Sequence, residues 1–165
     1  MPKVTIRYQL IKDARRFFEI LNNPNFIYFP TSVNSVAEEK KILKENAQKR
    51  KDNISWNYSI LYGNQLVGGI GVRINRTRPY AGEIGYFVDE KYWGKGISTQ
   101  AVKLAEQEGF KKLGLNRIEI IMRPENKASE KVAIKNGYKK EGRMKKAIKD
   151  KNGMMRDALL YAKTL

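Results

Sequence analysis

Two glycines at alternate positions, Gly94 and Gly96, lie in the segment whose residue types best suit a chemical role, residues 91–99 (KYWGKGIST). Glycine lets a chain turn tightly and lets a ligand approach the backbone without a Cβ in the way. A helix predicted to begin near Gly96 would add unpaired N–H groups and the positive end of its dipole. Lys95 adds a mobile positive charge, and two hydroxyl residues follow. Together these features predict a site for a pyrophosphate.

Three interpretations of this segment compete. It can be a plain strand–turn–helix connection with no ligand. A nucleotide-binding P-loop requires a serine or threonine directly after the lysine, but Gly96 follows Lys95. A dinucleotide fingerprint requires a third glycine where Thr99 stands, and it belongs on the first parallel strand of its sheet. The P-loop pattern therefore fails, and the dinucleotide interpretation is weak because three strands and two helices precede this segment.

Cysteine and histidine, which carry much of enzyme chemistry, are both absent from the 165 residues. Disulfides, thiolate nucleophiles and cysteine metal sites are therefore excluded. The commonest general base and metal ligand is missing as well. Any proton transfer must use Glu, Asp, Tyr, Lys, a terminus or water, and we expect no metal.

Length and composition predict one globular domain spanning residues 1–165. Hydrophobic residues make up 41% of the chain and aromatic residues 10%, which is typical of a folded protein. No apolar run approaches the ~20 residues that cross a membrane. The first residues also lack the apolar stretch of a signal peptide. We therefore expect a cytoplasmic protein without a membrane association, either a monomer or a homodimer.

The net charge of +16 comes from 33 Lys and Arg against 17 Asp and Glu. Such a basic surface attracts phosphates, nucleic acid or acidic ligands. The alternative is compositional drift, in which scattered lysines only solvate the surface. Two stretches concentrate the charge, one made of Lys40, Lys41, Lys44, Lys49, Arg50 and Lys51 and the other of Lys139, Lys140, Arg143, Lys145, Lys146, Lys149 and Lys151.

Periodicity predicts the elements that must position the glycine segment. Alternation and turn residues predict strands, whereas apolar residues three and four apart predict helices. Asp13 is expected to cap the first helix and Ser35 the second. The expected order is a strand 4–10, helices 14–21 and 35–51, strands 56–62, 66–74 and 80–88, a helix 96–113, a strand 116–122, a helix 127–135, and strands 138–148 and 155–162. This order predicts an α+β fold with one mixed, mostly antiparallel sheet and helices on both faces.

Several motifs together resemble the GNAT acetyltransferases. Residues 91–96 resemble the Gln/Arg-x-x-Gly-x-Gly/Ala signature of that family, with Lys91 in place of Gln or Arg. Residues 84–86 (IGY) are similar to the strand before it, and residues 126–138 resemble its Asn-x-x-Ser and Gly-Phe segment. The ending, residues 141–161, is similar to that of the Rim-type branch, which acetylates the N-termini of ribosomal proteins. The resemblance covers nearly the whole chain and implies the GNAT fold.

The resemblance implies an N-acetyltransferase that moves an acetyl group from acetyl-CoA to a primary amine, either a protein or peptide N-terminus or a small amine. It implies that acetyl-CoA is the cosubstrate and that no metal takes part. It also implies that the parallel strands separate to admit the pantetheine arm. Asn126 and Ser129 would lie near the thioester or the departing thiol. The residues that would bind acetyl-CoA are Phe87 and Val88 with the pantetheine, Gly94, Lys95, Gly96, Ile97, Ser98 and Thr99 with the pyrophosphate, and Asn126.

One departure from the family pattern concerns the group that protonates the thiolate. Many members carry a tyrosine in the segment after Asn126, where this sequence has Ala133 by spacing. Ser129, or a water held by Asn126, must then protonate the thiolate, or no protein group does.

Glu83 is the candidate general base, because an amine attacks a thioester only when it is neutral. Strand alternation places it on the same face as Gly85 and Phe87. The alternatives are that Glu83 pairs with Arg73 or Arg76, or that it anchors the substrate. With no cysteine to carry the acetyl group, direct attack in a ternary complex is favoured.

A different class of function stays open, namely a basic nucleic-acid- or ribosome-binding module on a decayed acetyltransferase fold. The sequence signatures of RNA-binding modules are absent, which argues against it. A third interpretation joins the two, an active enzyme whose basic surface associates with ribosomes.

Overall fold

The computed structural model describes residues 1–29 and 32–165. Its strands are β1 (Val4–Tyr8), β2 (Ser55–Tyr62), β3 (Gln65–Ile74), β4 (Ala81–Val88), β5 (Arg117–Met122), β6 (Lys139–Lys149) and β7 (Met155–Thr164). Its α-helices are α1 (Ala14–Leu21), α2 (Val36–Lys51), α3 (Ile97–Gln107) and α4 (Lys127–Lys135). The predicted order of helices and strands is confirmed.

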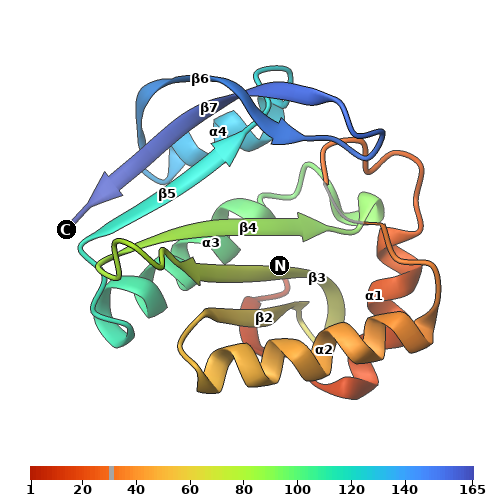
Figure 1. The fold of residues 1–165 in the computed structure, drawn as a ribbon. Coiled ribbons are helices and arrows are strands. Elements are labelled where there is room, and N and C mark those ends of the chain that lie inside the picture. The colour runs from red at the N-terminus through yellow and green to blue at the C-terminus, as the bar shows by residue number, and fades with distance from the viewer. Residues whose placement is uncertain (30–31) are drawn as a thin grey trace.

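The seven strands form one sheet in the order β1-β2-β3-β4-β5-β7-β6 (Figure 1). Neighbouring strands are antiparallel except β4 and β5, which are parallel. The β4–β5 register joins residues 81–83 to residues 117–119. Beyond these residues the two strands diverge toward their C-terminal ends (Figure 1). The predicted mixed, mostly antiparallel sheet is thus confirmed, together with the separation of its parallel strands.

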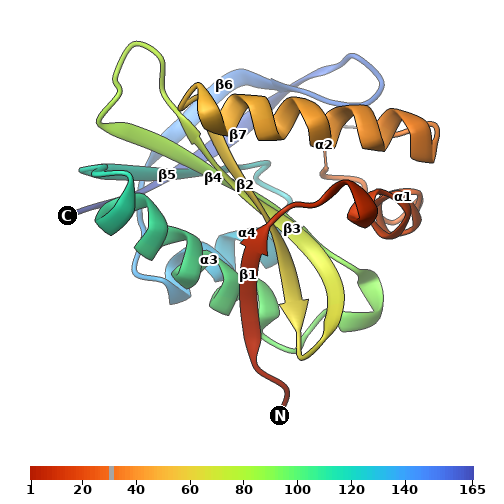
Figure 2. The same ribbon diagram turned by 90° about the horizontal axis from the view of Figure 1, so that it is seen from below.

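Helices cover both faces of the sheet, α1 and α2 on one face and α3 and α4 on the other (Figures 1 and 2). Alternation along β4 sends its side chains to both layers. Ile84 and Val88 join the large core with α3, whereas Phe87 packs with Phe17 of α1. Burying each such side chain stabilises the fold by about 1.5–3 kcal/mol. β4 therefore lies between two packed layers and has a different environment on each side.

Asp13 differs from its predicted role as the cap of α1, because its side chain makes no capping hydrogen bond to that helix and accepts instead from Leu10 N–H, at the start of the 3-10 turn Ile11–Asp13. It is 4% exposed and accepts hydrogen bonds from Arg7 at 2.8 and 2.9 Å and from Ser59 Oγ at 2.8 Å. Burial alone would raise the pKa of Asp13, but the hydrogen bonds from Arg7, Leu10 N–H and Ser59 together outweigh it and lower that pKa. A guanidinium donates two charge-assisted hydrogen bonds to a carboxylate, which stabilise it more than a single backbone N–H would. The ion pair with Arg7 therefore replaces the cap of α1. Ser35, in contrast, caps α2 as predicted and accepts from Glu38 N–H at 3.0 Å.

The helix predicted to run to about Leu113 ends earlier as an α-helix. After Gln107 the chain makes a π-helical turn, Glu108–Lys112, closed by the bond from Leu113 N–H to Glu108 O. Gly109 lies so close to Ile118 that a Cβ there would be 2.7 Å from Ile118 Cδ1. The wider turn thus fits the helix end against β5, a tertiary constraint that helical periodicity does not report.

Candidate functional site

The glycine turn has the backbone conformation that its residues predict. Gly94 and Gly96 have φ of 77° and 75°, in the left-handed region that side chains disfavour. Apart from each glycine and its two chain neighbours, no described residue has an atom within 4 Å of where a Cβ would be at either position. α3 begins directly after Gly96, and its first turn contains no acidic residue. The N–H groups of this turn are therefore available to an anion.

Several contacts fix the turn to the rest of the fold. Asp89 accepts from Lys91 N–H at 3.1 Å and forms an ion pair with Arg16 of α1. The indole Nε1 of Trp93 donates to Val88 O at 2.7 Å. These contacts hold the residues that lead from β4 into the glycine turn.

The other residues predicted to bind the pyrophosphate lie at the start of α3. The Lys95 ammonium lies 5.5 Å from the centre of the Tyr92 ring. Ile97 is 1% exposed in the core, so only its backbone can contact a ligand. Ser98 and Thr99 are half-buried, and Thr99 O accepts from the Asn136 amide at the end of α4. A lysine beside several helix N–H groups is suited to bind a diphosphate.

Where β4 and β5 diverge, alternate residues of β4 turn their backbone groups toward the gap between the two strands. Asp89 N–H donates to Val67 O of β3 at 2.7 Å. Because backbone groups alternate along an antiparallel strand, Phe87 also turns its N–H and C=O toward β3, whereas Tyr86 and Val88 turn theirs toward β5. Of the two residues expected to pair with pantetheine, Val88 thus faces the gap. Phe87 instead places its ring among Phe17 and Phe29, with centroids 5.6 and 5.0 Å away.

Asn126 and Ser129 lie at the start of α4. The Asn126 side chain accepts from Ser129 N–H at 3.2 Å and so caps the helix. The Ser129 hydroxyl lies 2.9 Å from the Tyr86 hydroxyl. Burial raises the pKa of Tyr86 to about 12, against a lowering effect of its hydrogen bond with Ser129. Tyr86 is a residue that the sequence interpretation did not select, although its alternation with Ile84 and Val88 indicates the same buried side.

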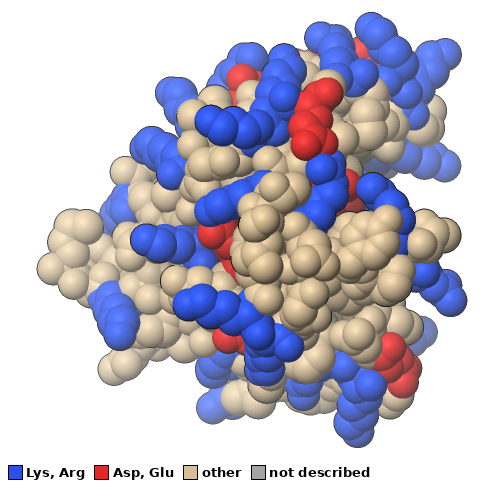
Figure 3. Space-filling model, turned by 90° about the vertical axis from the view of Figure 1, so that its left-hand side faces the viewer, with Lys and Arg blue, Asp and Glu red and all other residues tan. Residues whose placement is uncertain are grey.

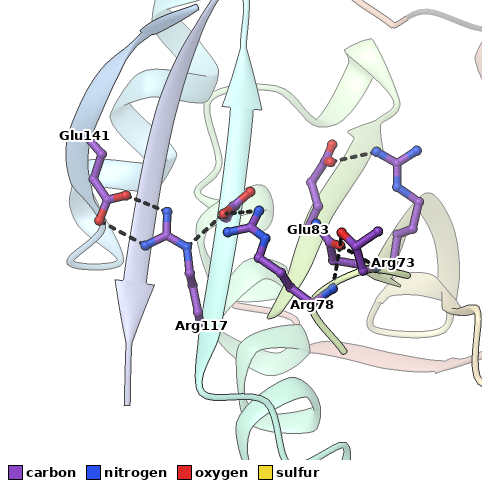
Figure 4. Close-up of polar contacts among 8 residues, drawn as sticks. Arg73, Arg78, Glu83, Arg117 and Glu141 are labelled. Atoms are coloured by element: carbon purple, nitrogen blue, oxygen red, sulfur yellow. Dashed lines mark hydrogen bonds and ion pairs between the residues drawn. The ribbon is translucent and has the colours of Figure 1, made fainter. Parts of the chain in front are cut away.

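Glu83 lies on the opposite face of β4. Its carboxylate accepts a hydrogen bond from Arg73 at 2.6 Å, one of the pairings that the sequence left open (Figure 4). Next to it on β5, Glu119 accepts from Arg117 at 2.7 Å, and Arg117 also pairs with Glu141 of β6. The hydrogen bonds of Arg117 with Glu141 and, second, with Glu119 raise the pKa of Arg117. The same hydrogen bond from Arg117 lowers the pKa of Glu141. Paired acidic and basic side chains of β3, β4, β5 and β6 thus cross this face of the sheet.

A cavity of about 320 Å³ adjoins Glu83, where β4 and β5 are still paired. The residues that line it are Arg73, Ile74, Asn75, Arg76, Ala81, Gly82, Glu83 and Glu119. Two residues further along β4, no described atom outside Gly85 and its two chain neighbours lies within 4 Å of where a Cβ of Gly85 would be. The Glu83 side of the gap is therefore open, whereas the Tyr86–Ser129 hydrogen bond spans the other side.

The structure thus separates the predicted residues into two groups. The glycine turn, Val88, Asn126 and Ser129 lie on the α3 and α4 side, where Asn136 joins the end of α4 to the first turn of α3. Glu83 lies across β4 from them. Within the described ranges, no helix is long and apolar enough to cross a membrane, and no three His, Cys, Asp or Glu side chains are grouped to hold a metal ion.

Comparisons with known proteins agree with this geometry. A family model described as "Acetyltransferase (GNAT) domain" matches residues 3–139. The chain is 31% identical over 161 residues to a ribosomal-protein-serine acetyltransferase of Escherichia coli, covering 96% of this chain and 85% of that protein. It is 32% identical over 131 residues to a probable N-acetyltransferase of Bacillus subtilis, covering 78% of this chain and 72% of that protein. A solved ribosomal L7/L12 α-N-protein acetyltransferase in complex with coenzyme A has a TM-score of 0.88 at 25% identity, covering 98% of this chain and 94% of that one.

Proposed function

The chain belongs to the GNAT family of acetyltransferases and is an acetyl-CoA-dependent N-acetyltransferase, and we propose that its acceptor is the N-terminal amine of a protein. The observation that carries this proposal is the open face of β4 at Gly85. An acceptor that enters there can leave the rest of its chain in solvent, as a protein terminus must. Two relatives whose names specify an acceptor act on ribosomal proteins, and we infer the same class here. Such a reaction takes place in the cytoplasm.

The residues present fit acetyl-CoA, which supplies the activated acetyl group. Positive φ at Gly94 and Gly96 and the uncapped start of α3 suit its pyrophosphate, with Lys95 as a countercharge. The gap-facing backbone of Val88 suits the amides of its pantetheine arm, and Ser129 lies beside the same gap.

The residues on the Glu83 side act on the acceptor. Glu83 presents a carboxylate beside open space at Gly85, where it can take the amine's proton directly or through a water molecule. Arg73, with 68% of its side chain exposed, holds that carboxylate in place without enclosing it. The amine then attacks the thioester directly. Most of the rate gain comes from holding both reactants at one opening in the sheet.

The basic surface suits association with ribosomes. β6 is an edge strand with the sequence KKEGRMKKAIK, in which Glu141 is the one acidic residue. Figure 3 shows basic side chains spread over one whole face of the molecule, with far fewer acidic ones among them. Such a field attracts RNA phosphates and acidic protein surfaces. A binding module without activity, the alternative class, is not favoured because the family members matched are acetyltransferases.

An acceptor screen tests the proposal. Acetyl-CoA turnover is measured with peptides that carry ribosomal-protein N-termini, with the same peptides blocked at the N-terminus, and with spermidine. We expect turnover with free N-termini and none with the blocked peptides. Turnover with spermidine that exceeds that of every peptide would overturn the proposed acceptor. CoA binding by calorimetry in the same buffer separates a wrong acceptor from an inactive protein.

A further inference from the structure

The hydrogen bond between Tyr86 and Ser129 joins the two sides of the gap where β4 and β5 diverge. Tyr86 lies on β4, three residues beyond the last paired position, Glu83. Ser129 lies in the first turn of α4, which follows β5. Their hydroxyl oxygens are 2.9 Å apart. An acetyl thioester that enters this gap must therefore pass beside the two hydroxyls.

The structure places no hydroxyl where the family resemblance locates an acid. That position is Ala133, which is fully buried. Ser129 is the hydroxyl nearest to Asn126 along α4, but an isolated serine hydroxyl can rotate and donate in several directions. A serine that must donate to one atom needs a neighbour that occupies its oxygen.

Tyr86 has the properties of such a neighbour. With its pKa raised by burial to about 12, the phenol stays protonated throughout the physiological range. A neutral phenol can donate its proton to the Ser129 oxygen, which leaves the Ser129 proton free to point elsewhere. Its ring packs against the core beside Ile84 and Val88, so the phenol oxygen has little freedom to move.

We propose that Tyr86 is a positioning residue that orients the Ser129 hydroxyl toward the departing sulfur of coenzyme A. The proposal deepens the acetyl transfer described above and rests on it. As the amine nitrogen bonds to the acetyl carbon and the carbon–sulfur bond breaks, the electron pair stays on sulfur. Ser129 donates a hydrogen bond to that developing anion, and Tyr86 donates to Ser129. The amine's proton leaves through Glu83 or water, and sulfur takes a proton from water as the thiol departs, which balances the reaction.

Three variants test the arrangement by kinetics. Ser129→Ala should lower kcat by about 10- to 100-fold, because it removes a hydrogen bond to a charged atom. Tyr86→Phe should lower kcat by about 3- to 10-fold with an unchanged KM for acetyl-CoA, and the double variant should be no worse than Ser129→Ala. Tyr58→Phe is the matched control, since its buried hydroxyl bonds to Glu108 instead. Additive losses, or a larger loss from Tyr86→Phe than from Ser129→Ala, would overturn the proposal.

An NMR measurement tests the same contact without turnover. Protein labelled with ¹³Cζ-tyrosine is titrated with CoA and with desulfo-CoA, which differ only in the thiol. The Tyr86 resonance, assigned through Tyr86→Phe, should shift more with CoA, and Ser129→Ala should abolish the difference. Equal shifts with both ligands would overturn the positioning role. Failure of both ligands to bind would instead refute acetyl-CoA binding itself, so the two failures are distinguishable.

Discussion

The two sides of β4 have opposite chemistry. On the side of α3 and α4 the polar contact at the gap joins two neutral hydroxyls, Tyr86 and Ser129, and burial raises the pKa of Tyr86. On the side of α1 and α2 the polar groups are ion pairs such as Arg73–Glu83 and Arg117–Glu119. A thioester needs a dry site with aligned donors, whereas an ammonium group must lose a proton to be reactive. Under the proposed function, one strand thus separates the environment for the donor from that for the acceptor.

The largest expected effect concerns the donor side. Gly96→Asp should weaken acetyl-CoA binding by more than about 100-fold, because a carboxylate would face the pyrophosphate and a side chain would strain a residue at positive φ. Calorimetry at low salt measures it. Gly114→Asp is the matched control, since Gly114 also has positive φ (68°) and open space at its Cβ position, but lies after the π-helical turn that follows α3. Equal losses in both variants would place the pyrophosphate elsewhere.

The next prediction concerns the acceptor side. Glu83→Gln should lower turnover at neutral pH by about 100-fold while CoA affinity stays nearly unchanged. The loss should shrink as rising pH deprotonates the amine without help. Arg73→Gln separates the two roles of Glu83, because it breaks the ion pair but keeps the carboxylate. If both variants lose the same activity and keep the wild-type pH–rate profile, Glu83 has a structural or anchoring role.

Stability should also differ between the two sides as pH changes. The pKa of Asp13 is lowered in the folded state, so its contribution is present above the unfolded value of about 3.9 and is lost as pH falls through the folded value. Asp13→Asn should therefore cost about 1–3 kcal/mol at pH 7, and less below about pH 4. The raised pKa of Tyr86 has the opposite sign, because its contribution is present below about pH 10 and is lost as pH rises toward 12. The free energy of unfolding in urea, measured across pH for Asp13→Asn and Tyr86→Phe against the wild type, tests the contrast.

Local patterns predicted the parts of this molecule that depend on neighbouring residues. The glycine turn, the order of helices and strands along the chain and the Ser35 cap follow from turn chemistry and periodicity over short segments. The pair Tyr86–Ser129 and the ion pair Arg7–Asp13 were not predicted. Their partners come from different elements, and no single sequence indicates which polar side chains meet across a fold. The Glu83 side of β4 is built mostly from such contacts, which is why local patterns left the partner of Glu83 open.

The smallest expected effect concerns the basic field outside both sites. At a net charge of +16, the protein should attract an acidic acceptor peptide over distances longer than any contact. Charges more than about 8–10 Å apart are screened at physiological salt, so the KM for such a peptide should rise by about 2- to 5-fold from low to physiological ionic strength. Measuring it at saturating acetyl-CoA excludes the salt dependence of CoA binding.

A matched pair of variants locates that field. Lys139→Gln with Lys140→Gln removes two of the six positive charges of the edge strand β6, which neighbours β7. Lys49→Gln with Lys51→Gln removes two positive charges from the last turn of α2 (Figure 1). Both pairs change the net charge by the same amount. If β6 guides the acceptor toward the gap, the first pair should raise the KM of an acidic peptide and reduce its salt dependence more than the second. Equal effects would mean that only the total charge matters. A KM indifferent to salt would mean that the acceptor is captured by contacts within the open face of β4 alone.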